Sequence, residues 1–397
     1  MTLLSTLSAC LQRETLDGAA RNELYRQLTQ TSCFVSYRDW FTSLINKRKQ
    51  MVLDQHPKFV HCSMSTIFHS PEYLKLVDQG PTASSSATRE LNWALEKVAL
   101  KHFNSLGKMW ALLEISEIQH NKQSTTQLAP GLSYMDDDYR GRLIDDVARC
   151  DLLVTSPHSE GLFTIAQAIC LANLKLFVLE QSWYELLPLL HHSAEGCHFV
   201  LLHQPIQDTP PCLAASAMIT DWTQHKRWLS FSPFFQHQHW QPLLEEHSLK
   251  RLLQTGAFVN LVPNISSLAD FDHHCRENVN PNAKLCEILR LTTAGGARQR
   301  LYLLYLAQKE MAQALCRAGY QCAYTIIENP WLLNFYAQLS DCAYINTGRY
   351  CIDHLGYPTY RGVWLVESFH QQYASIDFKQ YQQMVRTTQR NLEVHDA

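Results

Sequence analysis

The sequence has no long hydrophobic run and no excess of charge of one sign. No apolar stretch reaches the ~18 residues that a membrane-spanning helix needs, and the formal net charge of the 397-residue chain is −3. A membrane segment is therefore not expected. Nucleic acid is not expected as a partner either, because no strongly basic surface is predicted. We expect the protein to work in the cytoplasm.

Several motifs of catalysis and metal binding are also missing. The chain has no Gly-x-x-x-x-Gly-Lys-Ser/Thr phosphate loop and no Gly-x-Ser-x-Gly nucleophile turn. No Cys-x-x-Cys or His-Glu-x-x-His accompanies the nineteen histidines. Asp272-His273-His274-Cys275 spells the signature of membrane-bound palmitoyltransferases, but the membrane helices and cysteine-rich zinc module of that family are absent. We expect no metal and no tightly bound cofactor.

The thirteen cysteines do not form a disulfide pattern. Their number is odd, they are scattered along the chain, and several stand inside apolar runs, among them Cys150, Cys170, Cys286 and Cys322. Cysteine in such positions behaves as a small core residue, which suits a reducing compartment.

Length and composition permit two domains with sizeable cores. A chain of this length holds two domains of roughly 100–200 residues each, and 46% of the residues are hydrophobic. Gln204–Cys212 contains three prolines and few apolar residues, which is typical of a linker. The sequence predicts an α/β protein with an N-terminal α/β domain of unknown role at 1–205 and a second domain at 206–397. A break near Ser232-Pro233 is the alternative boundary.

The N-terminal part predicts helices first and then alternating elements. Residues 11–50 have the spacing of two helices, and a short strand is expected at Lys58–Cys62. Between 108 and 202, apolar strands alternating with amphipathic helices predict a parallel layer. The expected strands are Met109–Ile115, Leu152–Thr155, Leu174–Leu179 and His198–Leu202, and the expected helices are Tyr139–Arg149, Leu162–Leu171 and Trp183–His191.

Residues 284–339 carry the features that point to chemistry. They predict a strand, a glycine loop, a long helix, a second strand and a short helix. The first strand places Glu287 and Arg290 in an apolar run, where ionised side chains are costly unless they are paired or used. Gly295-Gly296-Ala297 then precedes the helix, and free N–H groups at a helix start bind anions. A polar pair and an anion-binding loop are therefore expected in one place.

This order of elements resembles the second half of the acyltransferase fold that includes the GNAT enzymes. Their loop pattern is Gln/Arg-x-x-Gly-x-Gly/Ala, and residues 292–297 (TTAGGA) match its Gly-x-Ala part without the leading Gln or Arg. The run CEILRL at 286–291 resembles the Glu-x-x-Arg strand of acyl-homoserine-lactone synthases, which have the same fold. The runs GYQCAYTIIENPWLLNFYAQL and YPTYRGVWLV resemble the LuxM/AinS-type synthases of vibrios. The N-terminal Arg/Trp/Asp signature of LuxI-type synthases is not visible.

The resemblance implies a quorum-sensing autoinducer synthase. Such an enzyme transfers an acyl group from acyl carrier protein or coenzyme A to the amine of S-adenosylmethionine, and lactone closure then releases methylthioadenosine. By the same resemblance, Glu287 is the expected base and Arg290 the expected clamp for the substrate carboxylate. The expected residues of the acyl-carrier loop are Thr292, Thr293, Gly295, Gly296, Ala297 and Arg298. Two alternatives remain, namely another N-acyltransferase of this fold and a non-catalytic sensor of acyl-thioesters.

The spacing of Glu287 and Arg290 makes a geometric demand. Residues three apart in a regular strand point to opposite faces, so the two side chains can share a pocket only if the strand is irregular between them. A β-bulge supplies one extra residue and reverses the alternation. We therefore predict a bulge near Ile288–Leu291. The alternative is that the two residues form an internal salt bridge.

Overall fold

The computed structural model describes residues 2–31, 36–60, 62–80, 86–124, 128–223, 228–232, 239–261, 265–328, 330–340, 342–351 and 358–393. The chain divides into two compact units. The first comprises Met1–Thr126, Gly161–Phe163 and Gln167–Ala194, and the second comprises Gln127–Glu160, Thr164–Ala166 and Glu195–Ala397. Within the described ranges, no helix is both long enough and apolar enough to cross a membrane.

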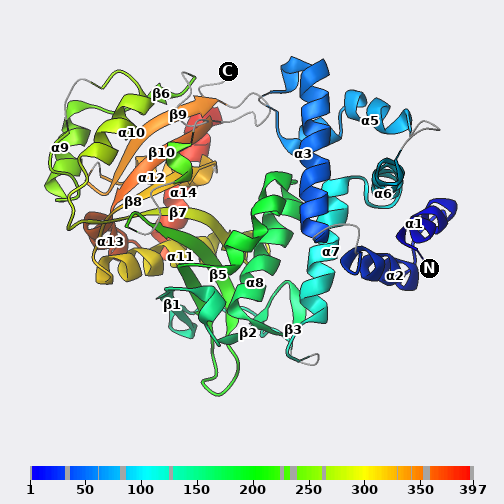
Figure 1. Ribbon diagram of the computed structural model, residues 1–397. Helices are drawn as coiled ribbons and strands as arrows, with labels where there is room; N and C mark the ends of the chain where they lie inside the picture. Colours follow the sequence, from blue (N-terminus) through cyan, green and yellow to red (C-terminus); the bar gives the residue numbers. More distant parts are fainter. Residues whose placement is uncertain are drawn as a thin grey trace. The chain divides into compact units, whose positions relative to one another are not determined.

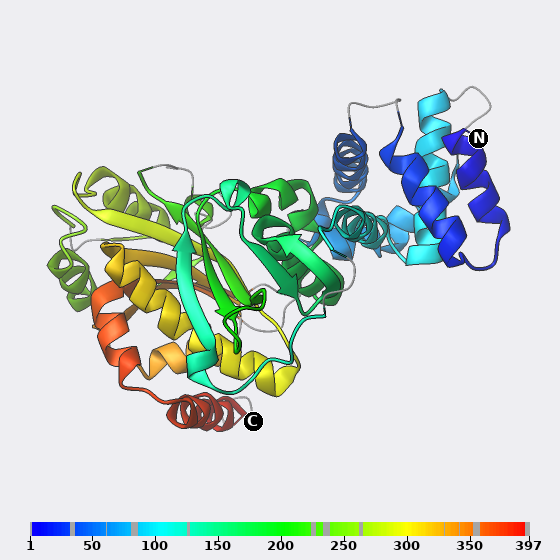
Figure 2. The same ribbon diagram turned by 90° about the horizontal axis from the view of Figure 1, so that it is seen from below.

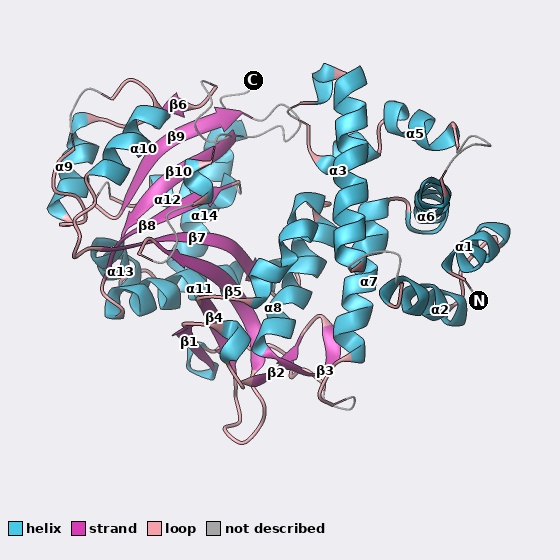
Figure 3. Ribbon diagram, in the orientation of Figure 1, coloured by secondary structure: helices cyan, strands magenta, loops and turns pink. Residues whose placement is uncertain are grey.

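The first unit is built mainly from helices, as Figure 3 shows. They are α1 (Leu3–Gln12), α2 (Gly18–Thr29), α3 (Tyr37–Gln55), α4 (Met64–Phe68), α5 (Pro71–Asp78), α6 (Ala87–Phe103), α7 (Leu106–His120) and most of α8 (Ile165–Asn173). Each helix from α1 to α7 follows a Ser, Thr or Asp whose side chain accepts a hydrogen bond from an N–H of the first turn. This capping fixes where the helices begin.

Two ion pairs with buried glutamates join helices of the first unit. Arg48 of α3 contacts Glu96 of α6 at 2.6 Å, and the Tyr73 hydroxyl donates a hydrogen bond to the same carboxylate. Arg38 of α3 contacts Glu114 of α7 at 2.7 Å. Both glutamates are fully buried, so these pairs hold α3 against its neighbours.

The second unit contains a mixed sheet (Figure 1). The strands are β1 (Tyr139–Ile144), β2 (Leu153–Ser156), β3 (Ser159–Thr164), β4 (His198–His203), β5 (Cys212–Asp221), β6 (Gln241–Pro242), β7 (Lys284–Thr293), β8 (Tyr320–Ile327), β9 (Tyr344–Cys351) and β10 (Pro358–Leu365). All lie in the second unit except the middle of β3, Gly161–Phe163. The order is β1-β4-β5-β7-β8-β10-β9-β6, with β2 pairing β5 and β3 off this path. The β7–β8 and β2–β5 pairs are parallel, and the other pairs along this path are antiparallel.

Helices cover both faces of this sheet. One face packs against α11 (Ala297–Arg317), α12 (Pro330–Ala337), α13 (Val366–Ala374) and α14 (Phe378–Glu393), which Figures 1 and 2 show together. The other face packs against α9 (Glu246–Gln254) and α10 (Leu268–Glu277). Along β7, Leu285 faces α9 and α10 while Cys286 and Ile288 face α11. This alternation places Glu287 on the α9/α10 face.

Several expectations for residues 58–179 are wrong. Pro57–Phe59 forms a 3-10 turn in place of a strand, and residues 109–115 lie inside α7. Leu174–Glu180 is a π-helical turn, whereas Tyr139–Ile144 is strand β1 rather than a helix. The predicted parallel layer is wrong as well, because β1, β4 and β5 run antiparallel. Short apolar runs fit a buried helix and a buried strand equally well.

The elements expected for residues 284–337 are confirmed as β7, α11, β8 and α12. Gly319, predicted to end the long helix, has φ = 80°, which glycine adopts without strain. The α/β class is confirmed at the level of a large mixed sheet with helices. The domain boundary at 205/206 stays a prediction, and the sheet contains strands from both sides of it.

Candidate active site

Strand β7 is irregular at the predicted place. Against β5, Leu289 pairs with Met218 and Thr292 pairs with Ser216, so Arg290 and Leu291 together oppose the single Ala217. Arg290 has φ = 56°, which is uncommon for a residue with a Cβ. One strand carrying an extra residue opposite its partner is a β-bulge. The predicted bulge is therefore confirmed.

Glu287 is anchored by backbone amides. Its side chain is fully buried, and its two oxygens accept hydrogen bonds from the N–H of Leu229 at 2.8 Å and of Ser230 at 2.6 Å. Burial raises the pKa of Glu287, and the hydrogen bonds together with the charge of Arg361 act in the opposite direction. The carboxylate thus holds the 3-10 turn Leu229–Phe231 against the sheet.

Arg290 lies at the bulge, three residues beyond Glu287. Its positive charge contributes to lowering the pKa of His198, to about 4, although burial is the larger cause. His198, Met218 and Leu289 are register partners across β4, β5 and β7, so they share a sheet face with Glu287. The charge of Arg290 therefore acts on His198, which lies on the Glu287 face. A pocket shared by the Glu287 and Arg290 side chains stays a prediction.

The loop expected to hold the acyl carrier follows directly. Thr292 is buried, and its hydroxyl is 2.8 Å from the Ser216 hydroxyl, while Thr293 pairs with Ala215 in the sheet. Gly295 has φ = 85°, a conformation that favours glycine. Gly296 precedes the first turn of α11 without a capping side chain.

The start of α11 has the charge of an anion-binding site. Ala297 and Arg298 are exposed in its first turn, which contains no acidic residue. The Arg300 side chain turns back and donates a hydrogen bond to the Gly295 carbonyl at 2.8 Å. Cations near a helix N-terminus are unfavourable unless an anion accompanies them. The exposed first turn is therefore suited to a phosphate group.

Sequence reasoning missed a second buried charge on the Glu287 face. Arg361 of β10 forms two hydrogen bonds with Asp272 of α10, at 3.0 and 2.6 Å, and both side chains are buried. The signal was present, because Arg361 stands in an apolar strand just as Glu287 does. Asp272 belongs to the Asp272-His273-His274-Cys275 run noted in the sequence, and Cys275 of the same run is also buried.

An aromatic pocket adjoins the anchored turn. It is lined by Trp222, Trp228, Phe231, Phe258, Cys275, Arg276, Val279, Leu285 and Tyr324. Trp228 stacks on Phe231 with ring centroids 5.5 Å apart, and Tyr324 approaches both rings. Tyr324 is the β8 register partner of Glu287, so the pocket lies beside the carboxylate.

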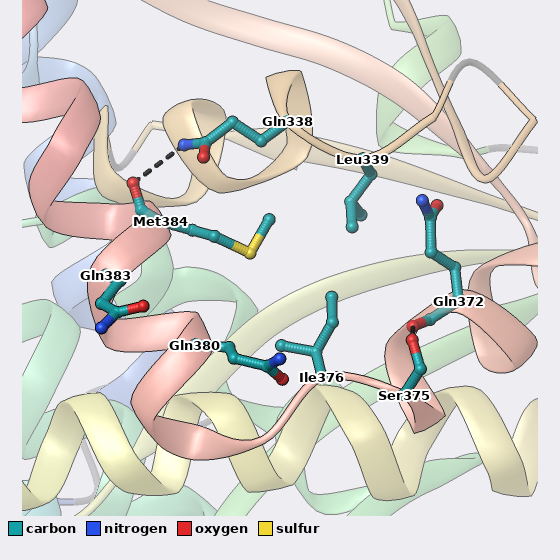
Figure 4. A pocket seen from close by; sticks show the side chains of 8 residues that line it. All are labelled: Gln338, Leu339, Gln372, Ser375, Ile376, Gln380, Gln383 and Met384. Atoms are coloured by element: carbon teal, nitrogen blue, oxygen red, sulfur yellow. Dashed lines mark hydrogen bonds between the residues drawn. The ribbon is translucent and has the colours of Figure 1, made fainter.

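A separate hollow lies among helices of the opposite face. Figure 4 shows Gln338, Leu339, Gln372, Ser375, Ile376, Gln380, Gln383 and Met384 around it. These residues belong to α13, α14 and the segments beside α12 and α13, and none is among the predicted site residues. Elsewhere in the described ranges, no three His, Cys, Asp or Glu side chains are grouped to hold a metal ion.

Comparison with known proteins identifies relatives over most of the chain. A family model described as acyl homoserine lactone synthase matches residues 22–392. The chain is 34% identical to the acyl-homoserine-lactone synthase OpaM of Vibrio parahaemolyticus, over 90% of this chain and 89% of the relative. It is 34% identical to the synthase LuxM of Vibrio campbellii over 88% of both chains, and 32% identical to LuxM of Vibrio atlanticus over 87% of both. No solved structure matches. The chain belongs to the acyl-homoserine-lactone synthase family.

Proposed function

We propose that this acyltransferase makes an acyl-homoserine lactone autoinducer from S-adenosylmethionine and an acyl-thioester. The family supports the reaction class. The strand β7, the loop and the start of α11 support the location of the site. The observation that carries the assignment is the buried Glu287 on the strand that contains the bulge at 290–291 and leads through the loop 294–296 into α11.

In the proposed first step, Glu287 accepts a proton from the substrate ammonium group. The free amine attacks the thioester carbonyl, a C–N bond forms, and the C–S bond breaks with release of the carrier thiol. Burial raises the pKa of Glu287, which makes its carboxylate a stronger base than an exposed one. Both oxygens are held by amides, so a bound water is the proposed relay between the carboxylate and the amine.

In the proposed second step, the substrate carboxylate closes the lactone ring. One oxygen attacks the carbon next to the sulfonium, and the C–S bond breaks to release neutral methylthioadenosine. Arg290 is the proposed clamp that orients this carboxylate, because guanidinium binds carboxylate in two-pronged fashion. Its position at the bulge supports that role.

The loop is the proposed site for the acyl carrier. Thr292, Thr293, Gly295, Gly296, Ala297 and Arg298 would place the phosphate of the pantetheine arm at the first turn of α11. The parallel β7–β8 pair joined by α11 supports the inference that this unit has the GNAT fold. Acyl carrier protein and coenzyme A carry the same pantetheine arm. Because S-adenosylmethionine and acyl-thioesters are made in the cytoplasm, the cytoplasm is the proposed site of action.

The proposal predicts that Glu287→Gln strongly slows synthesis. Pure protein with S-adenosylmethionine and a medium-chain acyl-thioester, on acyl carrier protein or on coenzyme A, should yield lactone and methylthioadenosine by mass spectrometry. We expect Glu287→Gln to slow turnover by roughly 10²–10⁴-fold, the usual contribution of a positioned base.

Glu246→Gln is the matched control, because Glu246 is an exposed glutamate in α9. It should retain wild-type rates. An unchanged rate in Glu287→Gln removes Glu287 from the mechanism. If the wild type makes neither lactone nor methylthioadenosine with either donor, the proposed reaction itself is contradicted.

A further inference from the structure

The buried ion pair of Arg361 and Asp272, between β10 and α10, is costly in desolvation free energy. The two side chains are 1% and 0% exposed, and two hydrogen bonds join them. Removing two charges from water offsets most of their attraction, so a buried pair is poor evidence for added stability. Apolar side chains of similar size would fill this layer as well. A role beyond packing is therefore worth seeking.

The sheet places Arg361 close to Glu287. Glu287 pairs with Tyr324 of β8, and Tyr324 pairs with Val363 of β10. Arg361 stands two residues from Val363 on β10, so it points to the same face as Glu287. One strand, represented by Tyr324, separates the two groups, and the charge of Arg361 acts on Glu287.

Helix α10 links the same two groups by a second route. Asp272 binds Arg361, and Arg276, one turn further on, covers the Phe231 ring with its guanidinium 5.8 Å from the ring centroid. Phe231 ends the turn whose amides bind Glu287. The carboxylate, its turn, α10 and Arg361 thus form one connected layer.

The charges of this layer explain why Arg361 matters. Glu287 and Asp272 are two buried carboxylates, and without a cation between them one would remain protonated. A protonated glutamate cannot accept a proton from the amine. We propose that Arg361, oriented by Asp272, is a positioning residue of the acyl-transfer centre that keeps the buried Glu287 carboxylate charged. This inference rests on the proposed function of Glu287 as base.

Other ionisable groups face this layer and must be considered in any pH measurement. They come from neighbouring elements: His198 of β4, Arg290 of β7, Tyr324 of β8, and Asp272, Cys275 and Arg276 of α10. The test therefore follows the Glu287 carboxyl itself as well as the rate.

The experiment compares Arg361→Met and Arg361→Lys with wild type in full-length protein. kcat/KM for lactone formation is measured against pH, and the infrared band of the protonated carboxyl that is lost in Glu287→Gln is titrated separately. We expect Arg361→Met to move the acid limb and the band midpoint up by about one pH unit, as for one charge lost across roughly 10 Å of protein. Arg361→Lys, which keeps the charge, should move them less.

Arg48→Met is the matched control, since it breaks a buried Arg–Glu pair in the helical unit. It should lower the melting temperature without moving either midpoint. If Arg361→Met does not fold, Arg361→Gln, which removes the charge but can still donate a hydrogen bond to Asp272, replaces it with the same expected direction. Folded variants with both midpoints unchanged overturn the inference. A shifted band in protein that makes no lactone supports the link to Glu287 and contradicts the proposed function.

Discussion

Glu287 and His198 are buried on the same sheet face, yet burial shifts their pKa values in opposite directions. Burial favours the neutral form of each group, so it raises the pKa of the carboxyl and lowers that of the imidazole. For Glu287 the amides of Leu229 and Ser230 offset part of that effect. His198 has a single hydrogen bond of this kind, to the Gly196 carbonyl at 3.3 Å, and stays neutral. The two residues should therefore contribute differently to pH-dependent stability.

His198 predicts a loss of stability in mild acid. Its pKa falls from 6.5 to about 4 on folding, so below pH 6.5 the unfolded chain binds a proton that the folded chain does not. Stability from this group is complete above pH 6.5 and decreases until about pH 4, by roughly 3 kcal/mol in all. Urea unfolding across this range should show a shallower pH slope in His198→Leu than in wild type. Equal slopes would contradict the assignment.

At the scale of elements, the bulge in β7 depends on an unusual backbone conformation. Arg290 adopts φ = 56°, which costs a residue with a Cβ roughly 1–2 kcal/mol and costs glycine little. Arg290→Gly and Arg290→Ala both remove the guanidinium, so the difference between their free energies of unfolding reports the cost of the backbone conformation alone.

We predict that Arg290→Gly is more stable than Arg290→Ala by about 1 kcal/mol in chemical unfolding. Both variants should lose lactone synthesis to the same extent, because activity depends on the missing clamp. Equal stability would mean that the strand straightens when the arginine is removed. Activity retained in either variant would contradict the role of Arg290.

The elements also show what the sequence could and could not predict. Helix α11 was predictable because its 21 residues contain no Pro or Gly and Gly319 follows it. Residues 109–115 were predicted as a strand because seven mostly apolar residues show no clear period; the missed signal was Ser105, which caps α7. The bulge followed from the spacing of Glu287 and Arg290. The turn that binds Glu287 lies 57 residues away in sequence, and no local pattern indicates such a contact.

At the scale of the molecule, the described cysteines form no disulfides, as the sequence predicts. Eleven described cysteines are free, and Cys10, Cys170, Cys212, Cys275, Cys286 and Cys322 are buried. Burial raises the pKa of Cys322 to about 12 and that of Cys212 to about 11. Thiolate is the reactive form, so these thiols should react only when the structure opens.

Thiol labelling therefore reports the unfolding of each compact unit. In rising urea, Cys286 and Cys322 should become labelled at one common concentration, because they lie on the paired strands β7 and β8. Cys10 and Cys170 report the helical unit in the same samples. Mass spectrometry of the labelled peptides gives all four midpoints. Separate midpoints for Cys286 and Cys322 would contradict cooperative unfolding of the sheet.

The extra residue in β7 also sets a rule for how this family can change length. Deleting one residue at 290–291 would let the strand run straight, because a single residue would then oppose Ala217 while Leu289 and Thr292 keep their partners on β5. The hydroxyl pair of Ser216 and Thr292 would remain, but the left-handed backbone conformation at Arg290 that sets the direction of its side chain would be lost. Insertions and deletions here should be rare among functional homologues, even where individual side chains differ.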